Sequence, residues 1–219
     1  MFTLSWPKKS MVVIGGVVLA LIGLFGGSNA VADTINLGFE TGNTSGWVAV
    51  IPSGGSISVV TSHGAETTTY LPVDGSYFAV LKTDGPGTYT SLSQAITLEA
   101  GSGLIGWAAF DAHDYWPYND NAAVQILSGA TLLATPWYSD VAMVGDFGDG
   151  PWTQWSWMAP AAGTYTLQYR IANALDSAFD SDALFDAATV VPEPATIALL
   201  GSGLVGLGLW KRNRIKARS

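Results

Sequence analysis

The segment TYTLQYRI, residues 164–171, decides the fold class of this chain. Its large apolar side chains fall on one face of an extended backbone: Tyr165, Leu167, Tyr169 and Ile171. Hydroxyl, amide and guanidinium side chains occupy the positions between them. This period of two is typical of a β-strand that buries one face. The segment is therefore predicted to be a strand packed against a hydrophobic core.

Similar segments precede and follow it in the sequence. Residues 92–98 alternate in the same way, and other strands are expected at 57–59, 77–81, 104–110, 122–127, 131–135, 153–158 and 184–190. Clusters of Gly, Pro, Asp and Asn separate them, as turns require. No segment between residues 33 and 190 has the apolar stripe of a helix. About nine or ten short strands without a helix predict an all-β sandwich or barrel, and residues 33–190 show no second domain boundary.

The charge of this domain is strongly one-sided. Residues 33–190 contain sixteen acidic side chains and two basic ones, Lys82 and Arg170, so their net charge is about −14. Such a surface repels nucleic acid and anionic lipid and attracts divalent cations. Excess acid also keeps a secreted protein soluble. We therefore expect no nucleic-acid partner, and metal binding stays open beside simple solubility.

The sequence offers little support for catalysis. The chain has no cysteine, which removes both thiol nucleophiles and disulfides. It has no Gly-x-Ser-x-Gly elbow, and its two histidines, His63 and His113, lie in separate polar segments without the spacing of a zinc site. A glycosidase needs two carboxylates, which sequence alone cannot select from sixteen. We therefore expect a protein that is not an enzyme.

The segment DAHDYWPYNDN, residues 111–121, is the densest in polar and aromatic side chains. Its proline and its Asn-Asp-Asn run predict a loop. Carboxylates in this loop are candidate ligands of a cation, although their spacing is not that of an EF-hand: Asp111, Asp114 and Asp120. The hypothesis is therefore a second cation site in this loop, beside the one considered below.

Aromatic side chains of the same loop suggest a different role. Three of them form a candidate platform for the apolar faces of sugar rings: Tyr115, Trp116 and Tyr118. Trp137 is added to the candidate ligand-binding residues because it flanks a Gly- and Asp-rich segment and is expected at the surface. A further interpretation is a loop that packs its own aromatics as a lid on the sandwich.

The last 29 residues, 191–219, differ from the rest of the chain. Residues 195–210 carry no charge, Trp210 ends this run, and five basic residues crowd the final nine. As a helix, these sixteen residues would span roughly 24 Å, and flanking Lys and Arg side chains can make up the remaining membrane thickness. The segment is predicted to be a transmembrane helix with its basic end in the cytoplasm.

The order of Pro192, Glu193 and Pro194, an apolar helix and a basic tail resembles the PEP-CTERM sorting signal. Proteins of that family are exported in bacteria that make extracellular polysaccharide, and an exosortase processes them near the Pro-Glu-Pro motif. The resemblance implies an exosortase partner, a precursor inserted in the inner membrane, and a mature form at the cell surface or outside the cell.

The first 32 residues agree with export. Lys8 and Lys9 precede an apolar run over residues 11–27, and Ala30-Val31-Ala32 fits the cleavage pattern of a secretory signal peptide. An uncleaved anchor is the alternative. The chain is thus predicted to contain a signal peptide at 1–32, a β-domain at 33–190 and a sorting signal at 191–219.

A second resemblance concerns the β-domain. Residues 36–40 (NLGFE) with Gly46-Trp47, and the segments 161–167 and 184–190, resemble the first and last strands of jelly-roll carbohydrate-binding and galactose-binding-like modules. Those modules often hold a calcium ion there. The resemblance implies Ca²⁺ ligands at Glu40 and Asp186, although Ala187 stands where the family commonly has a second polar residue. Otherwise the two acids are exposed or pair with Lys82 or Arg170.

Two hypotheses about function follow. In the first, the chain is an exported, non-catalytic protein whose calcium-stabilised jelly roll binds extracellular polysaccharide, preferably a neutral glycan because the domain is acidic. In the second, it is a structural protein of the biofilm matrix or cell surface without a saccharide ligand.

Overall fold

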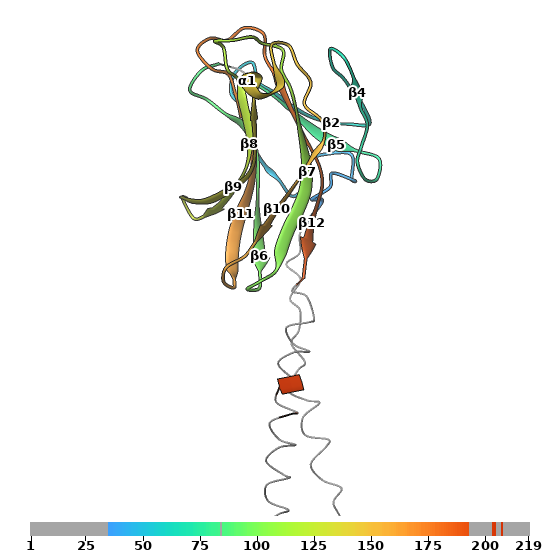
Figure 1. Cartoon of the computed structure of the whole chain (residues 1–219), viewed down its shortest axis with the longest axis vertical. Helices are drawn as coiled ribbons and strands as arrows, with labels where there is room; N and C mark the ends of the chain where they lie inside the picture. Colours follow the sequence, from blue (N-terminus) through green and yellow to red (C-terminus); the bar gives the residue numbers. More distant parts are fainter. Residues whose placement is uncertain (1–34, 84, 193–202, 205–206, 208–219) are drawn as a thin grey trace, which may run out of the picture. The chain divides into compact units, whose positions relative to one another are not determined.

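The computed structural model describes residues 35–83, 85–192, 203–204 and 207, and it shows an all-β sandwich (Figure 1). One five-stranded sheet has the order β1 (Val48–Val50), β6 (Thr90–Leu98), β11 (Gly163–Ala172), β8 (Asn121–Ser128), β9 (Thr131–Asp140). The other has the order β10 (Thr153–Met158), β7 (Gly103–Asp111), β12 (Asp182–Val191), β5 (Phe78–Lys82), β2 (Ser56–Val60). A two-stranded hairpin, β3 (His63–Gly64) and β4 (Thr69–Tyr70), and the turn of helix α1 (Val141–Val144) complete the described elements. The prediction of an all-β fold is confirmed, and of the two architectures considered it is the sandwich, with antiparallel strand pairs throughout the described residues.

Strand β11 lies at the centre of the first sheet, as its alternation requires. It pairs with β6 on one side and β8 on the other. The four predicted inward residues are buried, and the polar residues between them are half-buried on the outer face. The sequence pattern thus identified both the strand and the face that meets the core.

Aromatic rings fill the space between the sheets. The ring of Tyr169 in β11 stacks on Phe185 of β12, with centroids 4.2 Å apart and planes 5° from parallel. Trp47 stacks on the same tyrosine at 5.0 Å, Phe39 lies 6.3 Å away, and Trp155 of β10 meets it edge-on at 6.3 Å. Tyr169 therefore contacts both sheets and the N-terminal segment, and its ring is the centre of the core.

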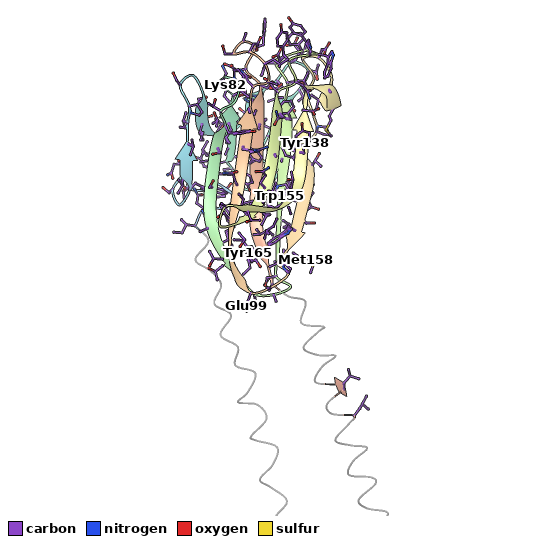
Figure 2. All side chains as sticks on the ribbon, turned by 90° about the vertical axis from the view of Figure 1, so that its left-hand side faces the viewer. Lys82, Glu99, Tyr138, Trp155, Met158 and Tyr165 are labelled. Carbon is purple, nitrogen blue, oxygen red and sulfur yellow. The ribbon has the colours of Figure 1, made fainter. Side chains whose placement is uncertain are left out.

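The two ends of the sandwich are distinct. β12 begins at Asp182, opposite Asp111 of β7, and ends at Val191, opposite Gly103. The loops that carry α1 lie at the Asp182 end, whereas the chain leaves the sandwich at the Val191 end (Figure 1). Figure 2 shows the same separation, with Lys82 towards the loop end and Glu99 at the other. The predicted signal peptide and nearly all of the predicted C-terminal helix fall outside the described residues; within those residues, no helix has the length and apolar character needed to cross a membrane.

Candidate functional site

Three loops meet at the Asp182 end and are tied together by hydrogen bonds that backbone amides donate. The amide of Phe147 donates to the carbonyl of Asp114 at 2.9 Å, and the amide of Trp116 donates to the Asp146 carboxylate at 2.9 Å. The amide of Ala174 donates to Oδ1 of Asp120, also at 2.9 Å. Segments far apart in the sequence are therefore held as one surface by hydrogen bonds, many of them to carboxylates.

Aromatic side chains gather on this surface. The ring of Tyr115 lies 5.4 Å from that of Tyr118, 5.7 Å from Phe147 and 6.2 Å from Phe179. Trp116 and Phe179 are 64% and 58% exposed, and Phe147 is 42% exposed. We call the four exposed residues, Tyr115, Trp116, Phe147 and Phe179, the aromatic tip.

The backbone of the aromatic tip is strained at two positions. Phe147 and Phe179 have φ angles of 55° and 56°, in the left-handed region that bulky residues rarely occupy. Such conformations persist where the surrounding structure enforces them, and they concentrate at functional sites. Sequence reasoning missed both phenylalanines, although each is an aromatic residue inside a Gly-, Ser- or Asp-rich turn.

The four residues predicted to bind sugar differ in exposure: two are exposed, one is half-buried and one is buried. Tyr115 and Trp116 belong to the aromatic tip, and Tyr118 lies half-buried against Tyr115. Trp137 is buried, with 8% of its surface exposed, and its ring meets Phe185 edge-on at 6.0 Å. The expected surface position of Trp137 is therefore wrong, because β9 extends to Asp140 and its alternation turns this side chain inward opposite Val124.

The three loop carboxylates do not share one ligand shell. Among the described residues, one group of His and acidic side chains has three or more ligand atoms within 4.8 Å of one another. Asp111 belongs to this group, whereas Asp114 and Asp120 do not. Asp114 and Asp120 are buried elsewhere in the loops, where each accepts backbone amide hydrogen bonds. The carboxylate of Asp120 also accepts the hydroxyl of Ser181 at 2.8 Å. The structure thus gives these acids separate partners.

Burial raises the pKa of Asp120 to about 6, although bonds from Ala174 and Ser181 oppose the shift and Asp114 adds to it. A carboxyl whose folded pKa lies above its unfolded value stabilises the fold fully below the unfolded value, and that contribution is lost as pH rises through about 6. We expect Asp120→Asn to gain stability relative to the wild type by about 2 kcal/mol between pH 4 and pH 7.5. Urea unfolding of both proteins at both pH values measures this change. Any pH-independent effect of the asparagine on stability cancels in the comparison. If the stability difference between the variant and the wild type is the same at both pH values, the raised pKa of Asp120 is contradicted.

Glu40 and Asp186 hold one loop from two sides. Glu40 accepts the amides of Ser76 and Tyr77 at 2.8 and 3.1 Å, and Asp186 accepts those of Val73 and Asp74 at 2.6 and 3.3 Å. Gly75 has a φ of 66°, and a Cβ there would overlap the Glu40 carboxylate. The pair therefore fastens the segment between β4 and β5.

Asp186 is fully buried, and its carboxylate is not paired with Lys82, which lies 3.1 Å from Asp180 instead. Burial raises the pKa of Asp186, three backbone amides oppose this, and the neighbouring Glu40 carboxylate raises it further. Glu40 and Asp186 lie close enough to repel each other when both are ionised, and a cation beside them would offset that repulsion.

A cluster of two histidines and two aspartates, not predicted from the sequence, lies at the loop end of the sandwich, where β7 ends and β12 begins. Nε2 of His63 lies 2.8 Å from Oδ2 of Asp111 and 3.6 Å from Oδ2 of Asp182. Nε2 of His113 lies 3.1 and 3.5 Å from the same two oxygens. The spacing of these residues in the sequence does not indicate a common site. Asp111 meets Asp182 through the register of β7 and β12, and the β3–β4 hairpin brings in His63, which is 48 residues from Asp111.

The charges in this cluster depend on one another. Hydrogen bonds to Asp111 and Asp182 raise the pKa of His113 to about 10, against the effect of its burial. Burial alone would raise the pKa of Asp111, but hydrogen bonds from His113 and His63 lower it on balance. Asp111 is therefore ionised at neutral pH although it is fully buried.

A groove lies on the outer face of the first sheet. Its cavity volume is about 370 Å³, and its lining includes Tyr89, Ser91, Gln168 and Arg170. The guanidinium carbon of Arg170 lies 4.2 Å above the centre of the Tyr89 ring, a cation–π arrangement. One ring face of Tyr89 is thus covered by Arg170, and this groove offers less open aromatic surface than the aromatic tip.

The chain is similar to several solved structures at low sequence identity. One is TmCBM61 in complex with β-1,4-galactotriose, with 18% identity, 73% of this chain and 97% of that chain covered, and a TM-score of 0.45. Another is the K1 cleaved adhesin domain of Lys-gingipain from Porphyromonas gingivalis W83, with 16% identity, 72% and 96% covered, and a TM-score of 0.47. A third is described among carbohydrate-binding modules of the β-sandwich superfamily, with 10% identity, 74% and 63% covered, and a TM-score of 0.46. No curated protein matches the chain.

The C-terminal segment matches a family model. The match covers residues 190–213 and includes Pro192, Glu193 and Pro194. It confirms the resemblance that these prolines, the apolar run and the basic residues indicated. Residues 190–213 are a PEP-CTERM protein-sorting motif.

Proposed function

We propose that the chain is an exported, non-catalytic surface protein whose jelly-roll domain binds a neutral extracellular polysaccharide at the aromatic tip. The observation that carries this proposal is the exposure of Trp116, Phe147 and Phe179 on one strained, hydrogen-bonded surface. The sorting motif supports export, with an exosortase as the processing partner.

The chemistry of the aromatic tip suits sugars. Aromatic faces accept the apolar C–H faces of pyranose rings, and nearby carboxylates accept their hydroxyl groups. Asp146 is exposed and lies beside Trp116, whose amide it accepts, and Asp176 lies in the loop that carries Phe179. The acidic domain would repel an anionic polymer, so the proposed ligand is neutral.

The position of the aromatic tip also fits a protein that is processed or anchored through its C-terminal sorting motif. The tip lies at the Asp182 end of β12, and the sorting motif begins at the Val191 end. A ten-residue strand is roughly 33 Å long, so a sandwich held at Val191 keeps this surface well away from its point of attachment. We propose a precursor inserted in the inner membrane and a mature form at the cell surface or outside the cell.

We further propose that one Ca²⁺ ion lies beside Glu40 and Asp186 and stabilises the loop at residues 73–77. Ca²⁺ takes oxygen ligands, and each carboxylate oxygen that accepts one amide keeps a second lone pair. The uncompensated charge of the two acids supports this proposal. The ion would hold the first and last parts of the domain together in a chain without cysteine.

A glycan array, followed by calorimetry on the best neutral oligosaccharide, tests the saccharide proposal. We expect Trp116→Ala and Phe179→Ala each to weaken binding at least about tenfold, since a central aromatic anchor contributes more than about 1 kcal/mol. Tyr89→Ala, in the groove on the first sheet, is the matched control and should bind like the wild type.

Two results would contradict the saccharide proposal. Loss of binding in Tyr89→Ala but not in the Trp116 and Phe179 variants would move the site to the groove. Absence of binding to every glycan, by a folded wild type with and without Ca²⁺, would favour the alternative of a structural matrix protein.

A further inference from the structure

The cluster of His63, Asp111, His113 and Asp182 has the dimensions of a metal site. Its four ligand atoms all lie within 4.8 Å of one another, and the four His–Asp separations run from 2.8 to 3.6 Å. Ligands at about 2.0–2.1 Å from a tetrahedral zinc ion are about 3.3–3.4 Å apart. Each of the four His–Asp separations lies within about 0.6 Å of that spacing.

The donor set selects the class of metal. Two imidazole nitrogens and two carboxylate oxygens suit zinc and neighbouring first-row divalent ions, whereas Ca²⁺ and Mg²⁺ prefer oxygen ligands alone. Both histidines present the same atom, Nε2, to both acids. This distinguishes the cluster from the pair formed by Glu40 and Asp186.

Burial supplies a second, independent observation. Asp111 is fully buried, and its second oxygen, Oδ1, accepts no hydrogen bond from any described residue. A buried carboxylate oxygen without a donor is costly, and it is a common sign of an ion that balances the charge. The His113 side chain is 39% exposed, which gives an ion access from solvent.

The cluster joins parts of the fold that are far apart in the sequence. His63 belongs to the β3–β4 hairpin, which lies outside both five-stranded sheets, whereas Asp111 and Asp182 belong to the central strands of the second sheet. The hairpin is also held by hydrogen bonds from Thr67 to Asp149 and from Tyr70 to Gly150, and by the buried Tyr70 ring, which belongs to an apolar cluster with residues of the second sheet. An ion at the cluster would thus act as a crosslink over a long stretch of sequence.

We infer that His63, Asp111, His113 and Asp182 bind one divalent first-row transition-metal ion, of the zinc type, which fastens the β3–β4 hairpin to the second sheet. Four protein ligands complete a tetrahedral shell, so the role is structural. The competing account is a set of ion pairs in which two imidazolium groups neutralise Asp111 and Asp182. The two accounts differ in what Zn²⁺ does to the imidazoles.

The chain has two histidines, so ¹⁵N-histidine labelling of the full-length, untagged protein in mild detergent yields imidazole signals from these two rings alone. We expect one equivalent of Zn²⁺ to shift the Nε2 signals of both together, and Ca²⁺ to leave them unmoved. Calorimetry with Zn²⁺ should show one ion per chain. At a hundredfold excess over Kd, the melting temperature should rise by about 5–10 °C.

Variants then assign the ligands. His63→Ala and His113→Ala should each weaken Zn²⁺ binding at least about a hundredfold. Glu99→Gln removes one negative charge at the opposite end of the sandwich and should bind Zn²⁺ like the wild type (Figure 2). This control separates specific ligation from attraction to an acidic surface.

The wild-type spectra decide the question even where a variant fails to fold. Imidazole signals that stay unmoved by Zn²⁺ overturn the inference, whether or not calorimetry detects heat. Binding that survives in both folded histidine variants also overturns it, because the ion would then be held by surface carboxylates.

Discussion

Replacing Tyr169 with alanine is expected to lower the free energy of unfolding by about 3–5 kcal/mol. The Tyr169 ring is fully buried and contacts Phe185, Trp47, Phe39 and Trp155. Its removal loses apolar burial and leaves a cavity between two sheets whose hydrogen-bonded strands cannot collapse freely. Urea unfolding followed by tryptophan fluorescence measures the effect.

Tyr169→Phe is the matched control for this prediction. The Tyr169 hydroxyl is buried and has no hydrogen-bond partner among the described residues. Its removal deletes a desolvated polar group and keeps the ring, so stability should stay within about 1 kcal/mol of the wild type or rise. A phenylalanine variant as unstable as the alanine variant would show that the hydroxyl, and not the ring stack, holds the core.

Replacing Asp186 with alanine is expected to cost about 2–3 kcal/mol, because the amides of Val73 and Asp74 lose their charged acceptor. Relief of the buried charge offsets part of the loss. Under the calcium proposal, chelation should lower the melting temperature of the wild type, and Ca²⁺ but not Mg²⁺ should restore it. The alanine variant should show neither response.

Asp186→Asn separates hydrogen bonding from metal binding at this position. The amide oxygen retains an acceptor for the loop but carries no charge, so stability should fall less than in the alanine variant while the response to Ca²⁺ disappears. A wild type whose melting temperature ignores both chelation and Ca²⁺ would end the calcium proposal. It would leave the loop anchored by the two carboxylates alone.

Much of the architecture was predictable from local patterns. Alternation in residues 164–171 identified a central strand, because side chains of a strand point to opposite faces whatever its partners are. The order of Pro-Glu-Pro, apolar run and basic end identified the sorting motif, because that signal is contiguous in the sequence. The buried Trp137 shows the limit of local reading, since its exposure depended on how far β9 continues.

The sequence by itself therefore determined the all-β class, the inward faces of the strands and the sorting motif, because each is encoded in neighbouring residues. The tertiary structure alone decided which distant side chains meet. The sequence spacing of His63 and His113 indicates no common site. They converge on Asp111 because β7 pairs with β12 and the β3–β4 hairpin places His63 beside the paired ends of these strands. Phe147 and Phe179 likewise join Tyr115 through three loops that no local pattern connects. Periodicity reports the environment of one segment, whereas a site requires the register between segments.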